Sequence, residues 1–172
     1  EEITALLNLV LTDSHLGLIM KSQFQRHSPR QLGQVASLGA AAEATGRYVE
    51  LSHGSVRNTV FPAEAAMAAD MVLGHAVGAT APLEAALAGS RAILLNPYGI
   101  KNENDALYAR ADIVYPSLNA ALEAIGGYRA GKPEKAGLGD WSSILAHFDS
   151  FRDGQAGQRL KKLLHEAVSG DP

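Results

Sequence analysis

The sequence predicts one α/β domain, a doubly wound parallel sheet with helices on both faces and a C-terminal docking helix. Two observations indicate this class. Short apolar runs bounded by polar residues, which are typical of buried parallel strands, recur along the chain. The stretches between them are long enough for a helix. With 172 residues, the chain has the size of one such domain, which we expect to span residues 1–172.

Five apolar runs are the expected strands. They are residues 6–11 (LLNLVL), 48–51, 71–73, 92–95 and 113–115. Helices are expected over residues 31–44, 62–69, 82–88 and 120–125, which are rich in Ala or Leu. Proline opens two of these segments, where its missing N–H costs little, and Gly46 and Gly89 follow two helix ends, where left-handed backbone favours glycine.

The last third of the chain is expected to hold a connector and a terminal helix. Residues 126–139 contain five glycines and a proline and predict an exposed connector. Residues 157–168 place Leu160, Leu163 and Leu164 on one helical stripe. We expect this stripe to dock on the domain.

Composition excludes several classes of function. Fifteen basic residues against eighteen acidic ones give a net charge of −3, which argues against a nucleic-acid partner. No apolar run reaches the roughly 18 residues of a transmembrane segment. The chain has no cysteine, and its six histidines lack metal-site spacing, so we expect neither a protein-bound metal nor a cofactor.

The sequence starts Glu1-Glu2 without methionine or leader, which predicts a fragment lacking an N-terminal partner domain.

Residues 69–97 carry the most informative pattern, a strand, a glycine-containing turn, a helix that opens near Thr80, and another strand. Backbone N–H groups at a helix N-terminus can bind phosphate without a basic side chain. Glu84 is expected in the first turn of this helix, where its carboxylate can accept hydrogen bonds from sugar hydroxyls. A glutamate there also complements the helix dipole, and the spacing alone slightly favours that interpretation.

Two segments carry a resemblance to a known family. Residues 83–97 (LEAALAGSRAILLNP) resemble the LEA-hydrophobic-A-x-G-x-P-V-I stretch in the nucleotide-binding half of GT-B glycosyltransferases. Residues 151–164 (FRDGQAGQRLKKLL) resemble the F-x-D-G-x-A-x-x-R tail of bacterial surface and capsular polysaccharide biosynthesis proteins. The resemblance extends over nearly the whole chain from about residue 7, and it implies a Rossmann-like fold.

The resemblance implies a nucleotide-sugar site. In the family, the glutamate of LEA contacts the nucleoside ribose, which corresponds to Glu84. The small residues before it hold the diphosphate, which corresponds to Gly78, Ala79 and Thr80. Many retaining members have a second glutamate eight residues before the first, and Ala76 stands there in this chain. Retaining chemistry of that subtype is therefore not implied.

Further polar residues follow expected strands. The resemblance implies that His53 and Gly54 meet the donor's phosphates or base, although a loop histidine is an equal alternative. His75 is either a phosphate ligand or a histidine at the edge of the core. Asp13 predicts either a general base facing the cleft or an N-cap. Tyr98 offers a ring for a base but also fits an ordinary turn. The catalytic residues stay unassigned.

The function expected is transfer of a sugar from a nucleotide-sugar donor to a growing surface polysaccharide or lipid-linked acceptor, which would bind through the missing domain. A nucleotide-sugar 2-epimerase half and a non-catalytic binding or assembly module of the same fold are the alternatives. We expect a cytoplasmic protein, with peripheral attachment to a membrane allowed, and an isolated chain that turns over nothing.

Overall fold

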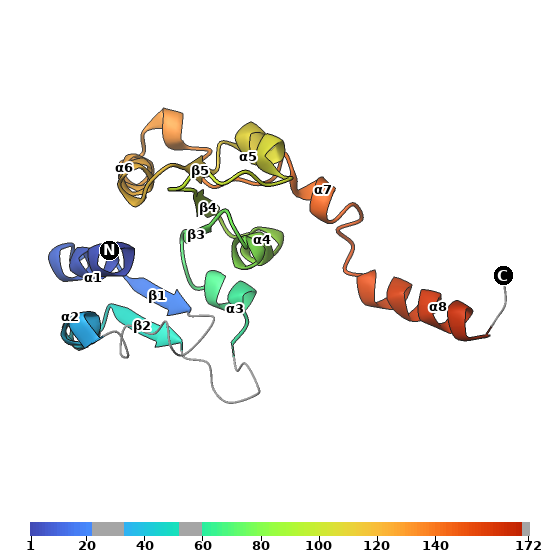
Figure 1. Ribbon diagram of the computed structural model, residues 1–172, viewed down its shortest axis with the longest axis horizontal. Helices are drawn as coiled ribbons and strands as arrows, with labels where there is room; N and C mark the ends of the chain where they lie inside the picture. The colour runs from blue at the N-terminus through green and yellow to red at the C-terminus, as the bar shows by residue number, and fades with distance from the viewer. Residues whose placement is uncertain (22–32, 52–59, 170–172) are drawn as a thin grey trace.

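The computed structural model describes residues 1–21, 33–51 and 60–169. The protein is α/β, with parallel strands in two small sheets and helices around them (Figure 1). The strands are β1 (Leu18–Lys21), β2 (Tyr48–Leu51), β3 (Val72–His75), β4 (Ala92–Leu95) and β5 (Val114–Tyr115). The helices are α1 (Glu2–Thr12), α2 (Gly33–Ala44), α3 (Pro62–Ala66), α4 (Thr80–Leu87), α5 (Asp105–Ala111), α6 (Leu118–Arg129), α7 (Leu145–Phe148) and α8 (Ala156–Ser169), with a 3-10 turn η3 (Pro133–Lys135).

The expected sheet is confirmed in part. β1 pairs with β2, and the second sheet has the order β3-β4-β5, with every pairing parallel. Within the described residues no ladder joins the two sheets, so a single doubly wound sheet is not seen.

β4 is the centre of the larger sheet, and its four side chains are all buried. Ala92 and Leu94 pack with residues of α4, α5 and α7 on one face. Ile93 and Leu95 pack with α6 on the other face. A strand covered on both faces has an unbroken apolar sequence, which explains why residues 92–95 were recognisable in the sequence.

The strand expected at residues 6–11 is wrong, because this segment lies inside α1. Leu7 and Val10 are fully buried against the β1–β2 unit. Ala5 and Leu6 pack instead on the core shared by β4 and α6. With Ile3, which packs on the same core as Leu7 and Val10, the spacings are four and three residues, as in a helix. One helix therefore contacts the cores of both sheets. The first strand, β1, comes only after α1 has ended.

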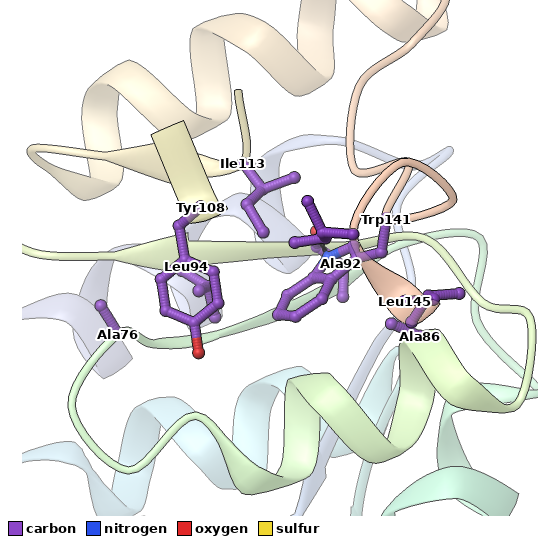
Figure 2. Packing of buried hydrophobic residues seen from close by; sticks show 9 residues of the cluster. Ala76, Ala86, Ala92, Leu94, Tyr108, Ile113, Trp141 and Leu145 are labelled. Atoms are coloured by element: carbon purple, nitrogen blue, oxygen red, sulfur yellow. Dashed lines mark hydrogen bonds between the residues drawn. The ribbon is translucent and has the colours of Figure 1, made fainter. Parts of the chain in front are cut away.

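The segment expected as an exposed connector is exposed over most of its length, but its end is anchored to the start of β4. α6 runs on to Arg129, and η3 follows it. The Ala92 N–H donates to the Gly139 carbonyl at 3.0 Å. The buried Trp141 donates its indole N–H to the Ala92 carbonyl at 2.7 Å. Trp141 lies between Tyr108 and Leu145 in the core that Figure 2 shows.

α8 does not dock, so that prediction is wrong. Helix α8 has no buried residue, and Figure 1 shows it projecting away from the rest of the chain beyond α7. Its helical stripe was predicted correctly, but a stripe shows only that a helix is amphipathic and not what covers it. None of the helices in the described parts is long and apolar enough to cross a bilayer.

The motif at residues 151–159 forms the start of α8. Asp153 makes a bidentate pair with Arg159, at 2.9 and 3.0 Å. Its Oδ1 also accepts the backbone N–H of Gln155 at 2.9 Å, just before the helix begins. The Arg159 guanidinium lies 4.1 Å from the centre of the Phe151 ring. Gly154 has φ of 71°, a left-handed conformation that favours glycine. The spacing F-x-D-G therefore encodes a helix cap.

This cap should respond to pH in a specific range. Hydrogen bonds from Arg159 and the Gln155 N–H lower the pKa of Asp153 to about 2. A depressed carboxyl pKa stabilises the folded cap above the unfolded value, and this stabilisation is lost as the pH falls through about 2. We expect the NMR shifts of the Gln155 amide and Asp153 side chain to titrate near 2, and Asp153→Asn to abolish the transition. A midpoint at the ordinary value of 3.8 would contradict the pairing in solution.

Candidate functional site

An open cleft of about 900 Å³ lies where β3 and β4 end. Its walls come from the first turns of α1 and α2, the last residue of β3 and the turn after β4. The residues that line it are Glu1, Glu2, Ile3, Thr4, Gly33, Val35, His75, Pro97 and Tyr98. Ligands of parallel α/β sheets bind at the carboxyl ends of the strands, so the cleft has the expected position for a site.

His75 and Glu2 face each other at this cleft. His75 ends β3, and its Nε2 lies 3.0 Å from Oε2 of Glu2 in α1. The side chains are 53% and 37% exposed, so His75 is not a histidine packed at the edge of the core. A carboxylate that holds an imidazole in one orientation, with solvent access, is the arrangement that proton transfer requires.

A rigid turn presents Tyr98 at the cleft. Asn96 follows β4, and its side-chain amide donates to the Ile100 carbonyl while its Oδ1 accepts the Ile100 N–H, both at 2.9 Å. Gly99 has φ of 59° and allows the chain to reverse. Tyr98 lies within this turn and is 84% exposed. An exposed ring on a fixed turn can stack on a flat ligand without ordering a loop first.

The predicted phosphate turn lies next to the cleft but does not line it. Gly78 and Ala79 belong to the turn between β3 and α4, and Thr80 is the first residue of α4. Gly78 comes three residues after His75, and none of the three residues lines the cleft. Gly78 has φ of 72°, and Ala79, the N-cap, makes no side-chain cap hydrogen bond. The position expected for these residues, a strand end beside a helix N-terminus, is what the structure has. Their binding of a phosphate stays a prediction.

β3 and α4 make an unusually close contact just behind this turn. A Cβ added at Gly74 would overlap the ring of Pro82. Pro82 is buried, whereas the turn residues Gly78 and Thr80 are exposed. The absence of a side chain at Gly74 therefore sets how near the first turn of α4 comes to the strand end.

The expected place of Glu84 in the first turn of α4 is wrong. α4 begins at Thr80, so Glu84 lies in the second turn, and no acidic residue occupies the first. The helix expected over residues 82–88 begins two residues later than α4 does, and a proline is tolerated anywhere in a turn whose N–H groups have no helical partner. Helical side chains lean toward the N-terminus, so the half-buried Glu84 still leans toward the turn. Its contact with a ribose stays a prediction.

Other candidates fall elsewhere. Asp13 ends α1 as its C-cap, and its Oδ2 lies 2.7 Å from a guanidinium nitrogen of Arg129 at the end of α6. This pair lowers the pKa of Asp13. The N-cap interpretation is wrong, because Asp13 is the C-cap of α1. Asp13 also follows a helix instead of a strand and does not line the cleft, and its role as a general base stays a prediction. His53 and Gly54 lie outside the described residues, and their role as donor ligands stays a prediction.

The contribution of α1 to the cleft was missed by sequence reasoning. Glu1 and Glu2 precede an apolar pattern with helical spacing, a signal for the first turn of a helix. In the parts of the chain that the structure describes, no cluster of three or more His, Asp or Glu side chains could hold a metal ion.

Comparison of the chain with known protein families, with curated proteins and with solved structures found no match.

Proposed function

We propose that this chain is the nucleotide-sugar-binding half of a GT-B-type glycosyltransferase that acts in bacterial surface polysaccharide biosynthesis, in the cytoplasm. The observation that carries the proposal is the juxtaposition at one sheet edge of a cleft, an exposed aromatic ring and a glycine turn that opens a helix. Each matches one part of a nucleoside diphosphate sugar. The motif resemblance at residues 83–97 and 151–164 supports the same assignment.

In this proposal the donor lies along the carboxyl edge. Tyr98 stacks on the base, and Glu84 accepts hydrogen bonds from the ribose. The diphosphate lies at the turn of Gly78 to Thr80, where the N-terminal dipole of α4 carries roughly half a positive charge. This dipole stabilises the charge that develops on the departing diphosphate. An acidic chain can bind an anion there without basic side chains.

His75 is the proposed proton acceptor for the acceptor hydroxyl. The Glu2 carboxylate at 3.0 Å orients the imidazole for this proton transfer. The hydroxyl oxygen then attacks the anomeric carbon, and the bond from that carbon to the diphosphate oxygen breaks. A single displacement of this kind inverts the configuration at the anomeric carbon. Ala76 in the place of a second glutamate is consistent with this outcome.

The test is a titration of the chain with UDP, GDP and CMP, followed by NMR shifts. We expect one of them to bind, and Glu84→Gln to weaken it about tenfold, because each hydrogen bond to a charged group contributes about 1.5–3 kcal/mol. Glu123→Gln is the matched control, since it changes an exposed carboxylate on α6 in the same way.

The outcomes separate the alternatives. Equal affinities in the wild type and Glu84→Gln would remove Glu84 from the site while leaving nucleotide binding intact. If none of the three nucleotides binds, the enzyme proposal fails, and a binding or assembly module of the same fold is favoured. Sugar transfer by this chain alone would show that a half-domain description is mistaken.

A further inference from the structure

Helix α8 presents an apolar face that no described residue covers. Its four large apolar side chains, Leu160, Leu163, Leu164 and Val168, are between 57% and 87% exposed. They recur at spacings of three and four residues and so share one side of the helix. Phe151, which is 67% exposed, is held beside the first turn by the Arg159 guanidinium. An exposed aromatic ring therefore lies beside the start of the helix that carries these aliphatic side chains.

The rest of α8 carries positive charge in an acidic protein. It holds the basic residues Arg159, Lys161 and Lys162 against one acidic residue, Glu166, while the whole chain has a net charge of −3. Arg159 is neutralised by Asp153, and Lys162 lies 3.8 Å from Glu166. The contact of Lys162 with Glu166 is exposed and weak, so the ammonium groups of Lys161 and Lys162 remain available to an anionic partner.

Two observations favour a lipid surface over a second copy of the chain. The stripe has four large apolar side chains, whereas each partner in a stable complex contributes roughly 20–30 residues and buries about 800 Å². In addition, α8 projects from the body beyond α7 (Figure 1), so it can lie flat on a surface. A bilayer needs no matching groove, and basic amphipathic helices of this kind lie in the interface with lysines toward the headgroups.

We propose that α8, with Phe151, attaches this protein to the surface of an anionic lipid bilayer. The apolar face enters the boundary between headgroups and acyl chains, and the lysines lie among the anionic headgroups. This attachment is independent of the proposed nucleotide site, because α8 contributes no residue to the cleft.

The test is cosedimentation of the whole chain with vesicles of phosphatidylcholine alone or with about a third phosphatidylglycerol. We expect binding to the anionic vesicles, weaker at high salt because screening shortens the reach of the lysine charges. The double variant Leu163→Gln, Leu164→Gln should bind at least about tenfold more weakly. The double variant Lys161→Gln, Lys162→Gln should lose roughly tenfold on anionic vesicles only.

Met67→Gln is the matched control, since Met67 is an apolar residue of similar exposure, 73%, outside α8. It should bind like the wild type. An unchanged melting temperature in the leucine variant would show that the fold is intact, as expected for side chains that are not buried. Equal binding by wild type and leucine variant would overturn the proposal, as would absence of binding to anionic vesicles. Dimerisation lost in the leucine variant, without vesicle binding, would assign the face to a second copy instead.

Discussion

Trp141→Ala is expected to lower the free energy of unfolding by about 3–5 kcal/mol, because it removes a large buried side chain and leaves a cavity. Trp141 is 2% exposed and packs edge-on to Tyr108, with ring centres 5.6 Å apart, and next to Phe148. Its indole N–H is also the donor to the Ala92 carbonyl at the start of the central strand. Urea unfolding followed by circular dichroism measures the change.

Trp141→Phe is the informative control. It retains an aromatic ring but leaves the Ala92 carbonyl without its indole donor, and we expect a smaller loss of about 1–3 kcal/mol. A loss below about 1 kcal/mol for Trp141→Ala would show that the segment after α6 contributes little to the core. This segment would then cover the sheet without contributing much to its stability.

The parts of the fold that could be predicted are those with a local signal. β2 and β4 have the bounds expected from the sequence, because strands between helices appear as short apolar runs. Gly46 and Gly89 have φ of 72° and 92°, as left-handed helix ends require. The turn before α4 also has a local signal in the sequence, because a glycine and a proline mark it within a few residues.

Other features depend on contacts that the sequence does not display. The run at residues 6–11 fits a strand by length, and only its packing on two different cores shows why it is a helix. The cleft brings Glu2 of α1 to His75 of β3, residues far apart in the chain. The prediction that α8 docks on the domain was wrong for a related reason. An amphipathic sequence predicts a helix with an apolar face, but it does not show what covers that face.

Gly74→Ala is expected to destabilise the protein by about 1–3 kcal/mol, because it overpacks the contact between β3 and α4. The new methyl group would overlap the ring of Pro82, which is buried and has no rotamer in which to move away. The clash can be relieved only by moving α4 away from β3. Since Thr80 begins α4, the same movement displaces the turn proposed to hold the diphosphate.

The variant therefore links packing to the proposed site. Gly74→Ala should lower the melting temperature and also weaken nucleotide binding at temperatures where the protein is still folded. Gly126→Ala is the matched control: Gly126 lies in α6 with open space where the methyl group of an alanine would lie, so alanine there should stabilise by about 1 kcal/mol and leave affinity unchanged. If Gly74→Ala unfolds more easily but binds nucleotide as tightly as the wild type, the close approach of α4 to β3 serves the core alone, and the phosphate must lie elsewhere along the carboxyl edge.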